Sequence, residues 1–398
     1  MKRKLLSAVL CTAMVATLLV GCGSTATEEA APAADAAATT EEAAPADDAA
    51  AASDDAAATD TAAADIDKSS ITIGVAMPTK DLQRWNQDGD NMKTQLETAG
   101  YKVDLQYASN DVATQVSQIE NMISSGDQLL VIASIDGSAL GSCLDQAKAA
   151  NIPVIAYDRL IMNTDAVSYY CSFDNYKVGV TQAQYVIDTL DLDNQDGPFN
   201  IEFCAGDPAD NNALLFYNGA MDTLKSYIDA GKLVVKSGQS AFADVATAGW
   251  STETCQSRVQ NIISSYYADG TKLDVVLCSN DSTALGACNA IDSDYNGDQP
   301  IVTGQDCDIA NMPNLIAGKQ SMSIYKDTRD LASKCVEMVD ALMSGSECEI
   351  NDTETYDNGV MVVPSYLCDV KFADKDNYKE LLIDSGYYTE DQLSGAAN

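Results

Sequence analysis

The chain has 398 residues, and its 60 acidic against 23 basic side chains give a formal net charge of −37. This length exceeds one ordinary domain and indicates two or three. The acidic excess argues against nucleic-acid binding, which needs clustered Lys and Arg. The chain contains no histidine, which excludes Ser-His-Asp and Cys-His catalysis and histidine-ligated zinc.

The first 22 residues have the pattern of a bacterial lipoprotein signal. A basic start, Lys2-Arg3-Lys4, precedes an apolar stretch over residues 5–20 that ends in Leu19-Val20-Gly21-Cys22. The stretch is shorter than the ~20 apolar residues that a spanning helix needs. We expect residues 1–21 to be a cleaved signal peptide and Cys22 to carry a lipid. The protein would then lie at the extracytoplasmic face of the cell membrane, in a Gram-positive type of envelope.

Residues 22–69 are rich in Ala, Asp, Glu, Thr and Pro. The stretch from Gly23 to Asp67 has no basic residue and one large aliphatic side chain, Ile66. Such a segment buries too little apolar surface to offset the entropy of ordering, and its carboxylates repel one another. We interpret it as a disordered spacer between the lipid anchor and a folded part.

From Ile71 onward, short β-rich runs alternate with longer segments of helical spacing. Several runs are continuously apolar, such as Leu129–Ala133, which is typical of strands covered by helices on both faces. The pattern predicts an α/β fold with parallel sheets in two Rossmann-like lobes. The predicted strands are 71–77, 102–108, 128–134, 153–157, 167–173, 199–206, 233–238, 273–279, 300–305 and 322–325. Predicted helices include 111–125, 139–149, 177–190, 212–228 and 252–267.

Polar and aromatic residues follow many of these strands, at the sheet edge where open parallel sheets bind ligands. Asp, Asn, Arg and Lys side chains can bind vicinal hydroxyls. The two tryptophans lie in opposite halves of the chain, and a pair of indoles could sandwich the apolar faces of a pyranose. Helix capping or surface ion pairing would explain some of these residues equally well. The candidates are Arg84, Trp85, Asp158, Arg159, Asn212, Trp250, Asn280, Asp306 and Lys326.

Seven segments, taken in order, resemble the xylose-binding and multiple-monosaccharide-binding periplasmic proteins of sugar ABC importers, within the ribose-binding-like family. The resemblance extends from about Ile71 to the end of the chain. The segments are Val75-Ala76-Met77 through Arg84-Trp85, Gln118–Ile123, Ala156-Tyr157-Asp158-Arg159, Ser172-Phe173-Asp174-Asn175, Asp210-Asn211-Asn212-Ala213, Ser279-Asn280-Asp281 and Gly304-Gln305-Asp306.

The resemblance implies a type I periplasmic binding protein fold, with two lobes that close on a sugar as a hinge. Three crossovers are expected near Phe173, Tyr325 and Val363. The first lobe would then comprise residues 70–173 and 327–362, and the second lobe residues 174–326 and 363–398.

The resemblance also implies a role for each candidate residue. Arg84, Asp158 and Arg159 would bind hydroxyls from the first lobe, and Asn212, Asn280 and Asp306 from the second. Trp85 and Trp250 would stack on opposite ring faces, and Lys326 would reach the sugar from a crossover. Asn211 could replace Asn212 by one register step, and Trp250 is the least secure transfer because residues 240–249 look longer than the xylose-binding pattern. Two Arg and one Lys could also admit a sugar acid.

Other features of the sequence say less about function. The ten cysteines of the folded part could be thiols or disulfides. Asp292–Gly297 begins like a calcium loop, but Thr303 stands where the bidentate Glu is needed, so a solvated turn is the better interpretation. No phosphate loop or nucleophile elbow is present. We expect no cofactor, no metal and no enzymatic activity.

The sequence therefore predicts a monomeric, lipid-anchored protein that binds a monosaccharide (xylose, glucose or a similar aldopyranose) and delivers it to the permease of an ABC importer. A sensor that presents the sugar to a chemoreceptor or sensor kinase stays open as an alternative. So do an exported hydrolase or lyase that uses a carboxylate pair such as Asp158 with Asp306, and a nucleoside or autoinducer receptor.

Overall fold

A computed structural model describes residues 66–395. The predicted signal peptide, the lipidation site Cys22 and the predicted spacer up to residue 65 lie outside the described residues. A short 3-10 turn, Lys68–Ser70, leads into the first strand. Among the described residues, no helix has both the length and the apolarity to cross a bilayer.

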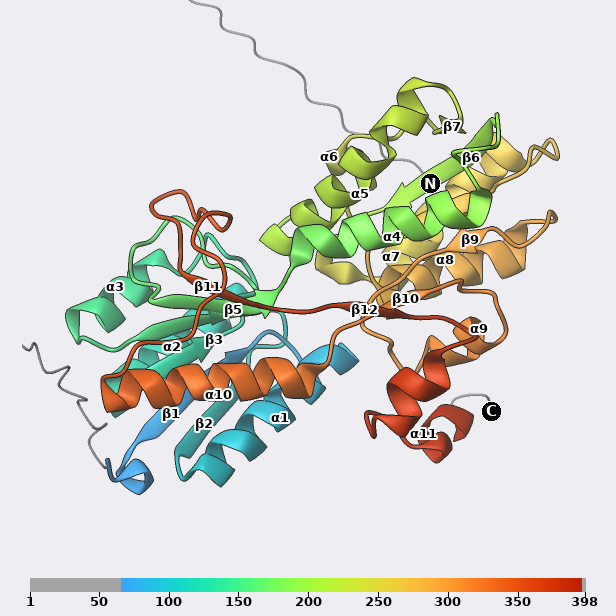
Figure 1. The fold of residues 1–398 in the computed structure, drawn as a ribbon. Helices are drawn as coiled ribbons and strands as arrows, with labels where there is room; N and C mark the ends of the chain where they lie inside the picture. The colour runs from blue at the N-terminus through green and yellow to red at the C-terminus, as the bar shows by residue number, and fades with distance from the viewer. Residues whose placement is uncertain (1–65, 396–398) are drawn as a thin grey trace, which may run out of the picture. The chain divides into compact units, whose positions relative to one another are not determined.

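Six parallel strands in the order β11-β5-β4-β3-β1-β2 form the sheet of the first lobe (Figure 1). Helices α1 and α10 cover one face of this sheet, and α2 and α3 cover the other. The strands are β1 (Thr72–Met77), β2 (Lys102–Tyr107), β3 (Leu129–Ile132), β4 (Val154–Tyr157), β5 (Tyr169–Phe173) and β11 (Ser365–Cys368); the helices are α1 (Gln83–Ala99), α2 (Val112–Ser125), α3 (Gly141–Ala149) and α10 (Thr328–Ser344).

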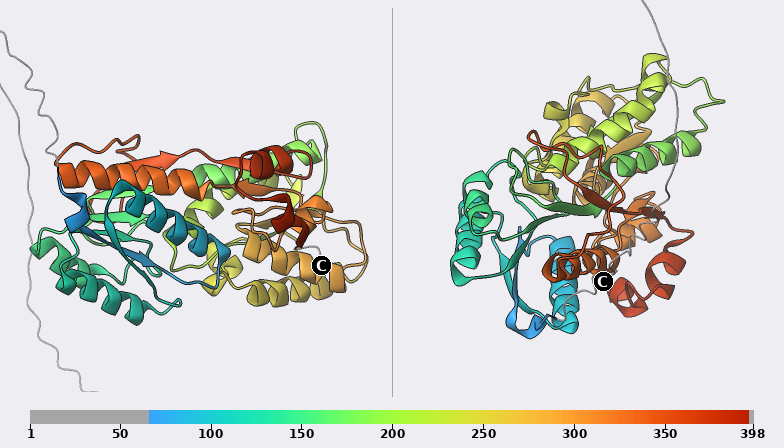
Figure 2. Two further views of the ribbon diagram at one scale, coloured as in Figure 1. Left: turned by 90° about the horizontal axis from the view of Figure 1, so that it is seen from below. Right: turned by 60° about the vertical axis from the view of Figure 1, so that its left-hand side comes forward.

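Four parallel strands in the order β7-β6-β8-β9 form the sheet of the second lobe. Helices α4 and α5 lie on one face, and α7 and α8 on the other. The two further views in Figure 2 show the same pair of helix-covered sheets. The elements are α4 (Asn175–Leu190), β6 (Phe199–Cys204), α5 (Asn211–Asp229), β7 (Leu233–Val234), α6 (Phe242–Val245), α7 (Thr252–Ile262), β8 (Val275–Cys278), α8 (Asp281–Asp294), β9 (Ile301–Val302) and α9 (Met312–Ile316).

The predicted α/β class with parallel sheets is confirmed. The central strands are fully buried, as their unbroken apolar sequences require, because helices cover both faces. Each of the five predicted helical segments contains a helix. In the last of them, α7 ends at Ile262 and a π-helical turn, Ile263–Tyr267, follows. Polar residues that follow the strands cap several of these helices: Asp111, Asp174, Asp210 and Asn280 each accept a backbone N–H of the first turn.

Three segments connect the lobes. The chain passes from β5 into α4, from β10 (Ser323–Tyr325) into α10, and from β11 into β12 (Lys371–Ala373), which pairs with β10 in an antiparallel ribbon. The third passage corrects a prediction. We expected it near Val363, but Ser365–Cys368 pairs with β5, so the chain leaves the first sheet only after Cys368. The described part of the chain ends with a π-helical turn, Lys379–Asp384, and α11 (Glu390–Gly395).

The ten cysteines of the described part are free thiols, nine of them buried. The segment that resembles a calcium loop begins in the last turn of α8 and continues past its end. Asp292 pairs with Lys319, and Asp294 accepts hydrogen bonds from Gln260 and Ser293. The described residues contain no group of acidic and cysteine side chains arranged to hold a metal ion.

Candidate functional site

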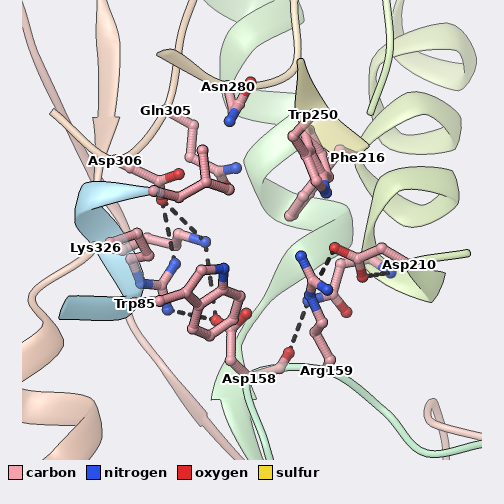
Figure 3. A pocket seen from close by; sticks show the side chains of 13 residues that line it. Trp85, Asp158, Arg159, Asp210, Phe216, Trp250, Asn280, Gln305, Asp306 and Lys326 are labelled. Atoms are coloured by element: carbon pink, nitrogen blue, oxygen red, sulfur yellow. Dashed lines mark hydrogen bonds and ion pairs between the residues drawn. The ribbon is translucent and has the colours of Figure 1, made fainter. Parts of the chain in front are cut away.

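All nine candidate side chains line one pocket between the two lobes, with a cavity volume of about 30 Å³. Figure 3 shows the pocket from close by, with the labelled side chains converging on it. Four further residues, which sequence reasoning did not assign to the site, complete the lining: Leu82, Asp210, Phe216 and Gln305.

Arg84, in the first turn of α1, is the centre of a buried charge network. Its Nε donates to Asp88 Oδ2 at 2.6 Å, and its two terminal nitrogens reach Asp158 Oδ1 at 2.5 Å and Asp306 Oδ1 at 3.2 Å. Asp88 is held from the other side by the hydroxyl of Tyr157 at 2.6 Å. Because Asp306 belongs to the second lobe and the others to the first, one guanidinium connects both lobes.

Two further cations, Lys326 and Arg159, form ion pairs with carboxylates of the pocket. Lys326 Nζ, on the passage into α10, lies 3.3 Å from Asp306 Oδ1 and 4.0 Å from Asp158 Oδ1. Arg159 Nε lies 3.0 Å from Asp210 Oδ2. All five side chains are at least nine-tenths buried. Such pairs are stable only when each charge keeps its partners.

Asn212 is the residue of the Asn211-Asn212 pair that reaches the pocket. Its Nδ2 donates to the carbonyl oxygen of Asp158 at 2.7 Å, and its Oδ1 accepts from Asn175 Nδ2 at 3.0 Å. The amide therefore joins α5 of the second lobe to the end of β4 in the first. Its neighbour Asn211 is half-buried and does not line the pocket.

The two tryptophans lie toward different sides of the pocket, Trp85 beside Asp158 and Lys326 and Trp250 beside Phe216 (Figure 3). The guanidinium of Arg159 lies 4.9 Å from the centroid of the Trp85 ring. Trp250 packs against Gly206, where a Cβ would come within 1.9 Å of the indole, so only glycine admits the ring there. The indole nitrogen of Trp250 is buried and has no hydrogen-bond partner among the described residues.

Three pocket residues have a left-handed backbone: Asp158 (φ 60°), Trp250 (φ 55°) and Asp306 (φ 92°). This conformation costs energy for a side chain other than glycine and is concentrated at functional sites in proteins. Asp158 directly follows β4, Trp250 is the last residue of a short 3-10 turn, and Asp306 lies in the loop after β9. The cost is offset by contacts such as the hydrogen bonds from Tyr170 and Ser172 to the carbonyl of Asp158.

The charge network holds Asp158 in its ionised form. Burial alone would raise the pKa of this carboxyl, but Arg84, Lys326 and Arg159 together lower it below the ordinary value. Asp158 and Asp306 bind the same guanidinium. A glycosidase needs one protonated carboxyl as its general acid, and a carboxyl with a lowered pKa does not suit that role.

Asn280 and Gln305 form the polar wall of the second lobe. Asn280 is both a helix cap and a pocket residue. Its Oδ1 caps α8 by accepting a hydrogen bond from Thr283 N at 3.0 Å, and its side chain lines the pocket. Gln305 Nε2 donates to the carbonyl of Ser279 at 3.2 Å, and its Oε1 is a buried acceptor without a partner among the described residues.

Comparison with known proteins places this pocket in context. Residues 73–347 match the family described as "Periplasmic binding protein domain". The chain is 51% identical over 326 residues to the multiple sugar-binding periplasmic receptor ChvE of Rhizobium radiobacter, covering 81% of this chain and 92% of the relative. It is 36% identical over 323 residues to the D-xylose-binding periplasmic protein of Escherichia coli, with 81% and 92% covered.

Among solved structures, an ABC transporter solute-binding protein from Clostridium phytofermentans with bound β-D-glucose is 70% identical. It has a TM-score of 0.80 and covers 81% of this chain and 99% of that one. A carbohydrate transporter solute-binding protein from Chloroflexus aurantiacus in complex with D-glucose is 34% identical, with a TM-score of 0.74 and coverage of 80% and 97%. Both structures share the two-lobed fold.

Proposed function

The chain belongs to the periplasmic binding protein domain family, with a type I fold, and from this premise we propose that it binds a neutral aldopyranose such as glucose or xylose in the pocket between its lobes. The nine predicted side chains are assigned as the sugar-binding residues. The observation that carries the proposal is their convergence, from both lobes, on one buried pocket of charged, amide and indole groups. It agrees with glucose and xylose as the ligands of the similar proteins.

The charges of the pocket favour a neutral ligand. Three cationic and three anionic side chains line it, Arg84, Arg159 and Lys326 against Asp158, Asp210 and Asp306. The positive groups thus already have carboxylate partners, and a sugar acid would add an uncompensated buried charge. Neutral hydroxyls can accept from the cations and donate to the carboxylates without changing this balance. We therefore expect galacturonate to bind much more weakly than galactose or glucose.

The indoles suit the other part of a pyranose, its apolar CH faces. Trp85 is 3% and Trp250 is 5% exposed, so a ring held between them would be removed from water. The unpartnered indole nitrogen of Trp250 and the unpartnered oxygen of Gln305 offer one donor and one acceptor for hydroxyls.

Tryptophan fluorescence tests the proposal directly, because the chain has only two tryptophans and both line the pocket. We expect a saturable change on titration with one or a few of xylose, glucose, galactose, arabinose and ribose. Trp85→Ala should weaken binding at least tenfold, about 1.4 kcal/mol, whereas Trp85→Phe, which keeps a flat apolar face, should lose less. Denaturation curves of both variants control for folding.

Binding without loss in Trp85→Ala would remove this residue from the site. If no monosaccharide changes the fluorescence or the thermal stability of the wild-type protein, the proposed ligand class is wrong, and nucleosides and oligosaccharides become the next candidates.

We further propose that the protein is a monomer, held at the membrane by a lipid on Cys22, that delivers its sugar to an ABC permease. Metabolic labelling with a radioactive fatty acid should label the wild-type protein and not Cys22→Ser. Uptake of labelled sugar should fall in cells that lack the protein. A sensing role without transport would leave uptake unchanged.

A further inference from the structure

The hydroxyl of Tyr388, near the C-terminus, lies between the two lobes beside the sugar pocket. It accepts hydrogen bonds from Gln83 Nε2 at 2.6 Å and Gln87 Nε2 at 3.1 Å, both on α1 of the first lobe. It donates to the carbonyl oxygen of Cys307 in the second lobe at 3.0 Å. The side chain is 3% exposed. One hydroxyl thus makes three hydrogen bonds that span both lobes.

The residues it connects are sequence neighbours of sugar-site residues. Gln83 precedes Arg84 and Trp85 in the first turn of α1, and Cys307 follows Asp306. A second bond crosses the same gap, because Ile309 N donates to Gln83 Oε1 at 3.0 Å. The position of Tyr388 is therefore coupled to the distance between the Arg84 segment and the Asp306 segment, although Tyr388 does not line the pocket.

The ring of Tyr388 is anchored in the second lobe. It belongs to an apolar cluster with Cys307, Leu315 of α9 and Leu382 and Leu393 of the C-terminal segment. In Figure 1 this segment, in red, lies beside α9. The adjacent Tyr387 also reaches the first lobe, where its hydroxyl lies 3.3 Å from Gln87 Oε1 and 3.4 Å from Thr328 Oγ1. The tyrosine pair is therefore packed in the second lobe and hydrogen-bonded to the first.

We propose that Tyr388 is a positioning residue that sets sugar affinity by stabilising the arrangement in which the two half-sites face each other. The inference rests on the proposed function and extends it to a residue outside the pocket. A ligand that needs both lobes is bound more tightly when contacts between the lobes already favour that arrangement. Because Tyr388 does not touch the sugar, its contribution is the same for every sugar that the pocket accepts.

The test is Tyr388→Phe, which keeps the ring in its cluster and removes only the hydroxyl. We expect the dissociation constants for glucose and xylose to rise together by roughly tenfold, with their ratio unchanged. The increase should lie mainly in the dissociation rate. Small-angle scattering of the sugar-free variant should show a larger radius of gyration than the wild type.

Tyr267→Phe is the matched control. The hydroxyl of Tyr267 donates to Glu202 Oε1 at 2.7 Å, a buried bond within the second lobe, so this variant should lose stability and keep its sugar affinity. The cycle of Tyr388→Phe with Gln83→Ala should be non-additive, because both changes remove the same bond.

An unchanged affinity in Tyr388→Phe overturns the inference. An equal loss in Tyr267→Phe also overturns it, because general destabilisation would then be the cause, and a changed ratio between sugars would mean that Tyr388 acts on the ligand itself. If the wild-type protein binds no sugar, the proposed function fails first, a result visible before any variant is made.

Discussion

Replacing Arg84 with alanine is expected to abolish measurable sugar binding and to lower the free energy of unfolding by about 3–5 kcal/mol. The guanidinium is the shared partner of Asp88, Asp158 and Asp306. Without it, Asp88 loses its ion-pair partner, and Asp158 and Asp306 keep only Lys326 within 4.0 Å, so the buried carboxyls must take up protons or admit water. The two half-sites then lose one of the groups that join them.

Arg84→Lys separates charge from geometry. A lysine keeps the positive charge but offers a single ammonium in place of a planar fork, and cannot bind three carboxylates in three directions. We expect it to recover part of the stability and to leave affinity at least tenfold below the wild type. Calorimetric titration and urea denaturation measure the two effects.

Arg258→Ala is a suitable control for the loss of a hydrogen-bonded, half-buried arginine. Its guanidinium donates to the carbonyl of Phe203 at 2.7 Å and to Gln239 Oε1 at 2.6 Å, within the second lobe. That variant should be less stable and should bind sugar as the wild type does. Wild-type affinity in Arg84→Ala would contradict the assignment of Arg84 to the site.

The stability of the protein is expected to fall as the pH rises from about 5 to 7.5. Burial raises the pKa of Asp88 to about 6, against the opposing charge of Arg84. Burial also raises the pKa of Asp281 to about 7, although Ser323 and Gln320 donate hydrogen bonds to it. In the unfolded chain such groups titrate near pH 4.

The sign follows from proton uptake. Between about pH 4 and these raised pKa values the folded protein holds protons that the unfolded chain has lost, so each group removes up to about 1.4 kcal/mol of stability per pH unit. The stability that these two carboxyls provide is fully present below about pH 4 and is lost as the pH rises through 6 to 7. Since the chain has no histidine, buried carboxyls dominate this range, and relief of the negative net charge acts in the same direction.

Urea denaturation at pH 5.5 and 7.5 measures this dependence, and Asp281→Asn identifies its source. The asparagine keeps an oxygen acceptor for Ser323 and Gln320 but does not titrate, so the slope should become shallower. Stability that rises with pH in the wild-type protein would show that these carboxyls are ionised throughout the range.

The sequence predicted the fold best where a run of residues is compatible with only one environment. Unbroken apolar runs such as Leu129–Ala133 must be covered on both faces, and they predict the central strands correctly. The edge strand Ser365–Cys368 mixes polar, aromatic and aliphatic residues. Only its pairing with β5 defines it as part of the first sheet, so the passage expected near Val363 was misplaced.

The same reasoning explains which pocket residues were found. Asp158 and Lys326 are charged residues directly after β-rich runs, and Arg84 lies in the segment that follows the first strand. Phe216 is an apolar position on α5 like any core residue. Asp210 caps that helix by accepting a hydrogen bond from Asn212 N on Oδ1. Its other oxygen, Oδ2, pairs with Arg159, which is distant in the sequence, so the capping role does not predict this contact.

The order of strands in the first sheet has a consequence for how the protein is made. The outermost strand, β11, is contributed by residues 365–368, whereas the other five come from residues 72–173. A growing chain therefore leaves the β5 edge unpaired until nearly all of it has been synthesised. Neither lobe can be produced from one uninterrupted stretch of the gene, and a truncation after residue 364 would open the sheet of the first lobe while also removing the tail of the second. Unpaired strand edges favour aggregation, so a chain that lacks β11 is expected to aggregate more readily than the full-length chain.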